Sequence, residues 1–250
     1  IPTKPSMFEN LNLESKISFF EVDIRDFSSF KKIILKEKPD FIFHLAAQAI
    51  VSVSYTDPVE TITSNAIGTM NLLEILRNYN KECFAVFITS DKCYDNVEWV
   101  WGYRETDRLG GKDPYSASKA MAELAIRTYV ESFFSAVDSN VRVGIARAGN
   151  VIGGGDWAKD RIVVDCMKSW SSGQVVDIRN PGATRPWQHV LEPLSGYMDL
   201  ASRLYSEGKT FQGGWNFGPL DEMSRTVGDL IENISKYDEN TNYVFCKTKH

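Results

Sequence analysis

Apolar and polar positions alternate along the chain in two distinct patterns. Continuous apolar runs occupy 40–45, 83–89 and 141–147, whereas residues 58–79 carry apolar side chains every three or four positions. A short continuous run predicts a strand buried on both faces of a parallel sheet, and the longer periodic segment predicts a covering helix. Strands that alternate with helices in this way predict an α/β fold built on a doubly wound parallel sheet.

The same patterns predict elements along the rest of the chain. We expect further helices at 27–38, around Tyr115 and Lys119, and at 161–170, 191–206 and 226–237. We expect further strands at 17–22, 175–178, 187–189, 215–217 and 242–246. Beyond about residue 150 the regular alternation ends, so we expect a larger part at 1–150 and a smaller lobe at 151–250.

Composition and net charge indicate a globular protein rather than a nucleic-acid-binding or membrane protein. Of 250 residues, 43% are apolar, which is ordinary for a globular protein, and the net charge of −5 does not suggest a nucleic-acid partner. No apolar stretch approaches the roughly 20 residues of a membrane span, and no signal peptide is visible. The four cysteines are scattered without metal-like spacing. We therefore expect a cytoplasmic protein with no nucleic-acid, membrane or metal partner.

Polar residues collect where the second apolar run ends. Ser90, Asp91 and Lys92 follow it directly, at the position where a parallel strand delivers side chains to the carboxyl edge of its sheet. Further on, Tyr115 and Lys119 stand four positions apart and share one face of a predicted helix. A lysine ammonium there favours the phenolate form of the tyrosine, which predicts a general base. A solvated Asp91–Lys92 ion pair and simple packing of Tyr115 are the alternatives.

A long polar and aromatic segment at about 93–112 predicts a loop between these two groups. Loops of that length inside a compact domain are usually functional. Its tryptophans, Trp99 and Trp101, either stack on a ligand or anchor the loop, and the sequence leaves both open.

Five strings of the chain resemble the sugar-nucleotide 4,6-dehydratases of the extended short-chain dehydrogenase/reductase superfamily. They are TSDKCYDN at 89–96, WVWGYRE at 99–105, DPYSASK at 113–119, NVIGGGDW at 150–157 and RPWQHV at 185–190. Lys92 discriminates within the family. Relatives that act on dTDP-glucose or GDP-mannose usually carry a glutamate there, and the epimerases have neither the Asp-Lys nor the Asp-Glu pair. The resemblance therefore favours CDP-glucose as the substrate.

The resemblance implies a Rossmann-like NAD-binding domain over 1–150 and a substrate-binding lobe over 151–250, both partial. The residues implied to contact NAD are Asp23, Ile24, Leu45, Ala46, Ala47, Gln48, Asn65, Thr89, Tyr115, Lys119, Ala148 and Gly149. Asp23 would meet the adenine amine. The alternative interpretation of Asp23 is an ordinary strand end. For residues 45–48 the alternative is simple strand packing, and for Asn65 it is a surface amide.

The implied reaction is an internal redox dehydration by a lyase, which converts CDP-glucose to CDP-4-dehydro-6-deoxyglucose with NAD as a transient hydride carrier. Tyr115 would take the proton of the sugar O4, with Ser90 hydrogen-bonded to O4 and Lys119 bound to the nicotinamide ribose. Lys92 would remove the C5 proton, and Asp91 would protonate the departing C6 hydroxyl.

Three further residues are implied to hold the substrate: Asn150, Arg161 and Arg185 would bind its diphosphate. A guanidinium suits this role because it binds phosphate oxygens in pairs. An exposed arginine without a ligand is the alternative for Arg161. The helices that follow Pro58 and Pro114 are the two through which family members pair, so the resemblance also implies a homodimer.

A dinucleotide-binding sheet normally opens with a strand, a glycine-rich turn and a helix, which bring backbone N–H groups to the pyrophosphate. No Gly-x-x-Gly-x-x-Gly turn follows a strand near the start of this chain. By resemblance we expect the sheet to lack its first strands and the chain to be a fragment truncated at both ends. Another NAD-dependent nucleotide-sugar dehydratase, an epimerase and a non-catalytic fragment are therefore the competing functions.

Overall fold

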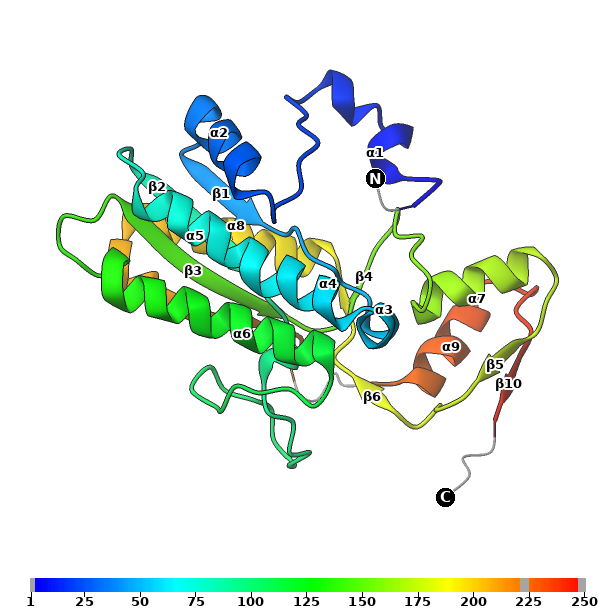
Figure 1. Cartoon of the computed structure of the whole chain (residues 1–250). Coiled ribbons are helices and arrows are strands. Elements are labelled where there is room, and N and C mark those ends of the chain that lie inside the picture. Colours follow the sequence, from blue (N-terminus) through cyan, green and yellow to red (C-terminus); the bar gives the residue numbers. More distant parts are fainter. Residues whose placement is uncertain (1–2, 221–224, 247–250) are drawn as a thin grey trace. The chain divides into compact units, whose positions relative to one another are not determined.

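The computed structural model describes residues 3–220 and 225–246 and divides them into two compact units (Figure 1). The larger unit consists of Phe20–Gly149 and Leu191–Phe217, and the smaller one of the described parts of Ile1–Phe19, Asn150–Val190 and Gly218–His250. The chain leaves the larger unit after Gly149 and returns to it at Leu191–Phe217. The division into 1–150 and 151–250 stays a prediction.

The larger unit is built on a parallel sheet with the strand order β1-β2-β3-β8. Its strands are β1 (Phe41–His44), β2 (Cys83–Ile88), β3 (Val141–Ala148) and β8 (Gly213–Phe217). Each strand pairs in parallel with its neighbour, for example Phe41 with Phe84 and Cys83 with Val141. The predicted class, a Rossmann-like α/β fold, is confirmed.

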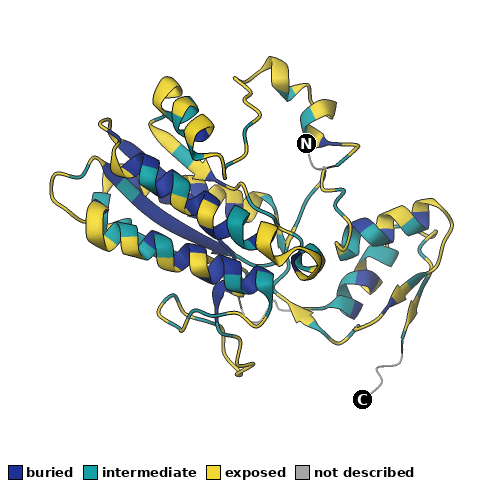
Figure 2. Ribbon diagram, viewed as in Figure 1, coloured by how far each residue is buried: buried dark blue, intermediate teal, exposed yellow. Residues whose placement is uncertain are grey.

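Helices cover both faces of this sheet. α2 (Phe27–Glu37), α5 (Gly68–Arg77) and α6 (Pro114–Tyr129) lie on one face, and α8 (Leu191–Ser206) lies on the other (Figure 1). Alternate residues of β2 enter the two cores, since Ala85 and Phe87 pack with the first group of helices and Phe84 and Val86 with α8. β2 and β3 are therefore buried on both sides (Figure 2), which explains their continuous apolar sequences.

The predicted helix at 58–79 is interrupted by one wide turn. α3 (Val51–Thr56) is followed by α4 (Pro58–Ile62), the π-helical turn η2 (Thr63–Ile67) and then α5. Single π turns inside α-helices are frequent at functional sites. Here the turn carries the buried Asn65.

The strand predicted at 17–22 is not formed. The segment runs without regular structure between the short helix η1 (Leu13–Ser15) and α2. A strand is stabilised by its ladder of hydrogen bonds, and in the described part of the sheet β1 is an edge strand whose partner is β2. Asp23 and Ile24 therefore lie in a turn before α2 rather than at the end of a strand.

The smaller unit holds the remaining short elements. They are α1 (Met7–Asn10), β4 (Val151–Ile152), α7 (Ile162–Ser171), β5 (Val176–Ile178), β6 (Thr184–Arg185), β7 (Gln188–His189), β9 (Arg225–Thr226), α9 (Val227–Ser235) and β10 (Tyr243–Phe245). Cys166, Trp170, Ile178 and Ile231 form its core. The predicted elements beyond residue 150 thus appear within a few residues of their expected positions. In the described parts of both units, we find no helix with the length and apolar character to cross a membrane.

Candidate active site

The carboxyl end of β2 delivers Ser90, Asp91 and Lys92 to the edge of the sheet, as predicted. The short turn η3 (Asp91–Cys93) follows the strand, and Ser90 caps it by accepting a hydrogen bond from the Lys92 backbone N–H at 3.2 Å. The Ser90 hydroxyl donates to Asp91 Oδ1 at 2.9 Å. Ser90 is buried, Asp91 is half-buried and Lys92 is exposed. The turn therefore presents a carboxyl and an amino side chain at one edge of the sheet.

Tyr115 and Lys119 lie in the first two turns of α6, which packs against η3. Asp113 caps this helix by accepting hydrogen bonds from the Ser116 N–H at 2.9 Å and the Ser116 hydroxyl at 2.6 Å. Tyr115 and Lys119 are both buried. The structure thus brings the helix with the predicted general base next to the Ser90–Lys92 turn.

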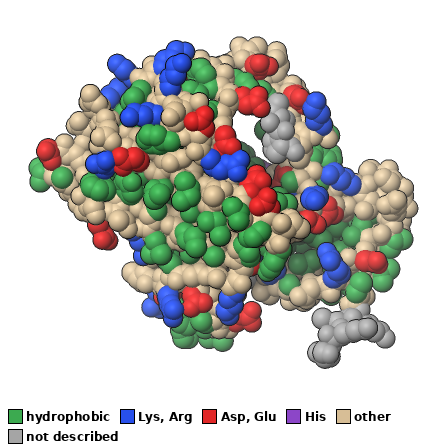
Figure 3. Space-filling model, viewed as in Figure 1, with side chains coloured by type: hydrophobic (Ala, Val, Ile, Leu, Met, Phe, Trp, Pro, Cys, Tyr) green, Lys and Arg blue, Asp and Glu red, His purple; other side chains and the backbone are tan. Residues whose placement is uncertain are grey.

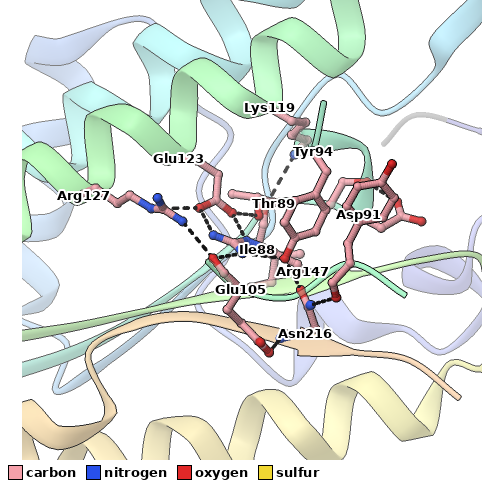
Figure 4. Close-up of polar contacts among 12 residues, drawn as sticks. Ile88, Thr89, Asp91, Tyr94, Glu105, Lys119, Glu123, Arg127, Arg147 and Asn216 are labelled. Atoms are coloured by element: carbon pink, nitrogen blue, oxygen red, sulfur yellow. Dashed lines mark hydrogen bonds and ion pairs between the residues drawn. The ribbon is translucent and has the colours of Figure 1, made fainter. Parts of the chain in front are cut away.

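The Lys119 ammonium is nearly enclosed by protein. Its Nζ donates one long hydrogen bond, 3.5 Å, to the carbonyl of Ile88 at the end of β2 (Figure 4). Burial lowers the pKa of Lys119 to about 8, while the nearby Cys93 and Glu123 oppose the shift. An ammonium has three N–H donors, so this buried cation has capacity to bind ligand hydroxyls. That observation fits the ribose of the predicted cofactor.

Asn65 connects the segment after β1 to the same helix. Its side chain accepts a hydrogen bond from the Gln48 N–H at 2.8 Å and donates to the Gln48 carbonyl at 3.0 Å. It also donates to Ser118 Oγ at 2.9 Å, and Ser118 donates to the carbonyl of Tyr115 at 2.7 Å. Asn65 is 2% exposed, so the alternative of a surface amide is wrong.

The other predicted cofactor residues lie around the carboxyl edge of the sheet. Leu45 and Ala46 are exposed after β1, and Ala47 is half-buried. Ala148 ends β3, and Gly149 follows it. The contact of these residues with a cofactor stays a prediction.

Asp23 pairs with Arg25 in the turn before α2. Arg25 Nη2 lies 2.6 Å from Asp23 Oδ2, and this hydrogen bond holds the pKa of the Asp23 carboxyl below its usual value. Ile24 packs against Gly68 of α5, where a Cβ atom would come within 2.5 Å of Ile24 Cδ1. Asp23 is exposed and remains a predicted contact of the adenine.

The three predicted diphosphate residues belong to the smaller unit. Asn150 is half-buried, and its carbonyl accepts a hydrogen bond from the Gln188 N–H at 3.0 Å. Arg161 is exposed and lies 3.8 Å from Asp156. Arg185 is exposed on β6 and donates to the carbonyl of Thr184 at 2.7 Å. The catalytic candidates, in contrast, all belong to the larger unit.

The tryptophans of the long loop stack on one another, with ring centroids 5.0 Å apart. Trp99 also lies 5.5 Å from Tyr103, which stacks on Tyr94 at 5.1 Å. The aromatic residues therefore form a continuous set that begins at Tyr94, directly after η3.

Glu123 and Arg147, which no motif in the sequence singles out, form a fully buried ion pair close to η3 (Figure 4). Arg147 Nε and Nη2 donate to the two carboxylate oxygens of Glu123 at 2.8 Å each. Thr89, predicted to touch the cofactor, donates to Glu123 Oε1 at 2.6 Å. An arginine inside an apolar run and a glutamate four positions after Lys119 are the signals that identify the pair in retrospect.

Comparison with known proteins relates the chain to enzymes of nucleotide sugars. A family model described as GDP-mannose 4,6 dehydratase matches residues 5–203. The chain is 51% identical to the CDP-glucose 4,6-dehydratase of Salmonella typhimurium over 93% of its residues, and 28% identical to the CDP-paratose 2-epimerase of Salmonella typhi over 72%. It spans 66% of the length of the first relative and 55% of the second.

Solved structures with the same fold include nucleotide-sugar epimerases. A UDP-glucose 4-epimerase of Thermotoga maritima, in complex with UDP-glucose, superposes with a TM-score of 0.81 over 99% of this chain and 76% of its own, at 22% identity. A UDP-glucose 4-epimerase of Thermus thermophilus, in complex with NAD, superposes with a TM-score of 0.76 over 92% of this chain and 72% of its own, at 25% identity.

Proposed function

Because this chain belongs to the GDP-mannose 4,6-dehydratase family, we propose that it acts as a lyase that removes water from a nucleotide sugar. The substrate proposed is CDP-glucose, and the product is CDP-4-dehydro-6-deoxyglucose. The observation that carries the proposal is the Ser90–Asp91–Lys92 turn packed against the helix of the buried Tyr115 and Lys119. The high identity to a CDP-glucose 4,6-dehydratase supports the choice of nucleotide. We also propose that the protein acts in the cytoplasm.

NAD is the proposed cofactor, and when bound it supplies a reversible acceptor for a hydride. Lys119 would donate its remaining N–H groups to the hydroxyls of the nicotinamide ribose. Thr89, Ala148 and Gly149 would lie at the nicotinamide end, and Leu45–Gln48, held in place by Asn65, would lie along the cofactor. Asp23 and Ile24 would lie at its adenine end.

We assign each side chain at the site either a proton transfer or a hydrogen bond to the sugar. The Tyr115 phenolate would accept the proton of the sugar O4, and Ser90 would donate a hydrogen bond to O4. The 4-ketone formed in this way acidifies the C5 proton. Lys92 would remove that proton as a neutral amine, and Asp91 would give its proton to the C6 hydroxyl, which leaves as water.

Asp91 and Lys92 thereby end the elimination with their proton states exchanged. Lys92 has gained the C5 proton and Asp91 has lost its own, so the pair carries no net change in protons. Reduction at C6 and reprotonation at C5 by Lys92 then complete the product, and the proton that Tyr115 took from the sugar O4 would replace the one that Asp91 gave up. In the smaller unit, Arg161 and Arg185 would bind the diphosphate together with Asn150.

Mass spectrometry of products tests the proposal. The chain is incubated with NAD⁺ and, separately, with CDP-, dTDP-, GDP- and UDP-glucose. Loss of one water from the CDP sugar alone is the expected result. Loss of water from another nucleotide sugar would correct the substrate. An unchanged mass together with a new sugar signal in the NMR spectrum would favour an epimerase, because an epimer has the mass of its substrate. No reaction with any of the four would support a non-catalytic chain.

We further propose that the chain pairs with a second copy through α4, α5 and α6. These helices expose apolar side chains, among them Val59, Met70, Met121 and Leu124. Figure 3 shows hydrophobic side chains gathered over the face that α5 and α6 cover. Exposed apolar patches of this kind often mark protein–protein contacts.

A further inference from the structure

The Glu123–Arg147 ion pair is deeply buried, with both side chains 0% exposed. Arg147 lies on β3 and Glu123 on α6, so the pair joins the sheet to the helix that carries Tyr115 and Lys119. Burial alone would lower the pKa of Arg147, but its hydrogen bonds to Glu123 and the opposite charge raise it above the ordinary value. A buried pair stabilises a fold little more than apolar residues of the same size would. Its presence here therefore calls for another role, and its contacts indicate one.

Glu123 contacts both flanks of the Ser90–Asp91–Lys92 sequence. On the amino-terminal side, the hydroxyl of Thr89 donates to Glu123 Oε1 at 2.6 Å. On the carboxyl-terminal side, the buried thiol of Cys93 lies near the same carboxylate; burial raises the pKa of this thiol, and the Glu123 charge adds to the shift. One carboxylate therefore holds the residue before Ser90 and the residue after Lys92.

Arg147 holds the next residue of the turn. Its Nη1 donates to the hydroxyl of Tyr94 at 2.6 Å, and its guanidinium carbon lies 5.0 Å from the centre of the Tyr94 ring. The Tyr94 hydroxyl in turn donates to Asn216 Oδ1 on β8 at 2.7 Å. Gly214 leaves room for this guanidinium, because a Cβ atom there would lie 2.6 Å from Arg147 Nη2.

Arg147 also binds the long loop at about 93–112. Arg147 Nη1 donates to the carbonyl of Glu105 at 3.1 Å, and the Glu105 side chain accepts a hydrogen bond from the Asn216 N–H at 2.9 Å (Figure 4). The loop is thus fastened near both of its ends, at Tyr94 and at Glu105, to one buried cation.

Tyr115, Lys119 and Glu123 follow one another at intervals of four on α6, so they line one face of the helix. Glu123 is thereby fixed relative to Tyr115 by the helix and relative to Ser90–Lys92 by its hydrogen bonds. We propose that Glu123 and Arg147 are positioning residues that set the distance between the Tyr115 base and the Asp91–Lys92 acid–base pair. This role rests on the proposed function, since it assigns a task within that reaction.

The test compares Glu123→Met, Arg147→Met and the double variant E123M/R147M. Each single variant takes the hydrogen-bonded partner from a buried charge, and in Arg147→Met the Glu123 carboxylate keeps only the more distant Arg127, at 3.9 Å. The melting temperature of each should therefore fall by about 10 °C. The double variant replaces the pair by apolar side chains of similar length and should regain most of that loss. Its kcat should nevertheless stay about 100-fold below wild type with KM within about 3-fold, because misplaced groups slow the chemical step rather than binding.

A matched control removes an exposed ion pair of the same unit. Asp199 and Arg203 lie 3.0 Å apart on α8, on the opposite face of the sheet, and the variant D199N/R203M should keep kcat within about 2-fold. Turnover of E123M/R147M that recovers together with its melting temperature would overturn the positioning role, since the pair would then serve folding alone.

Hydrogen exchange supplies a reading that does not depend on turnover. In NAD⁺-treated protein, amides of a peptide spanning Thr89–Tyr94 should exchange at least about 10-fold faster in E123M/R147M than in wild type, with peptides of α8 unchanged. Equal exchange in the two proteins would overturn the inference even if activity fell. If the wild-type chain transforms no nucleotide sugar, the proposed function fails, and the exchange experiment still decides whether the pair holds the turn.

Discussion

At the scale of single residues, buried and exposed polar side chains lie close together at the end of β2. Ser90 is buried and Lys92 is exposed only two positions later. Tyr115 and Lys119, on α6, are both buried. The protonation and burial of individual side chains give two predictions on activity and one on stability.

Tyr115→Phe removes only the phenolic oxygen, so the fold should be kept. If Tyr115 is the base for the sugar O4, kcat should fall by at least about 100-fold, since a positioned general base contributes that much. Product formation from CDP-glucose measures the loss. Tyr129→Phe on the same helix is the control, and full activity of Tyr115→Phe would remove Tyr115 from the mechanism.

Lys92→Met should separate the two halves of the reaction. Oxidation at C4 does not need the Lys92 amine, whereas elimination does, so reduced cofactor should accumulate with its absorbance near 340 nm while water loss stops. Lys81→Met, at another exposed lysine, should behave like wild type. Unchanged turnover of Lys92→Met would contradict its role as the base at C5.

His44 makes stability depend on pH. Burial, with a smaller contribution from the Lys119 charge, lowers the pKa of His44 to about 4 from its ordinary 6.5. Between these values the unfolded chain binds a proton that the folded chain does not, so stability is present above pH 6.5 and is lost as the pH falls toward 4. We expect His44 to account for about 2 kcal/mol of the loss in unfolding free energy between pH 7 and pH 5.

Urea unfolding at the two pH values measures this difference. His44→Gln should unfold with a pH dependence smaller by that amount, whatever its absolute stability. His189→Gln, at an exposed histidine, is the comparison. An identical pH dependence in wild type and His44→Gln would show that His44 titrates normally in the folded protein.

At the scale of elements, the caps and the wide turn decide where the side chains point. Asp113 begins α6 two residues before Tyr115, so the cap and the base share one helical turn. The π turn at Thr63–Ile67 brings Asn65 against Gln48 and Ser118. Local backbone geometry thus sets the site as much as the side chains themselves.

Asp113→Ala should therefore cost both stability and activity. Loss of the cap should lower the unfolding free energy by about 1 kcal/mol. Fraying of the first turn should also reduce kcat by several-fold. Asp26→Ala removes the equivalent cap of α2, which accepts from the Ser29 N–H at 3.1 Å, and should cost similar stability with kcat kept. Equal kcat values for the two variants would mean that the cap serves stability only.

Local pattern was enough to predict most elements, and the exceptions have physical reasons. The apolar runs of β2 and β3 and the helical period of α8 are properties of neighbouring residues, so they can be read directly. The segment 17–22 has strand-like residues but pairs with no described strand. The π turn brings Asn65 onto Gln48 and Ser118, which are contacts between distant segments that no local pattern encodes.

The sequence pattern singles out the catalytic candidates, but it does not single out the buried residues that contact them. Ser90, Asp91 and Lys92 stand together in the sequence, and Tyr115 and Lys119 share a helical spacing. Glu123 and Arg147 are 24 positions apart, on a helix and a strand, and only the fold brings them together. A buried ion pair of this kind becomes visible when burial is known.

At the scale of the whole molecule, the exposed apolar face of α4, α5 and α6 bears on how two copies of the chain pair. Leu124 on α6 is 55% exposed, and its replacement by glutamate should disrupt the proposed dimer. Sedimentation velocity should then detect a monomer at concentrations where wild type is dimeric. Met198 on α8 is 68% exposed, and Met198→Glu should leave the dimer intact. A monomeric wild type would contradict the dimer proposal.

The path of the chain between the two units bears on how the protein can be dissected. A cut near residue 150, where the sequence pattern changes, would separate β3 from β8 and strip the sheet of α8. Expression of residues 1–150 should therefore yield an aggregating fragment, because Phe84, Val86 and Ala146 would lose their cover. A separable larger unit would require excision of Asn150–Val190 and ligation of Gly149 to Leu191, so the smaller unit is, in topological terms, partly an insertion.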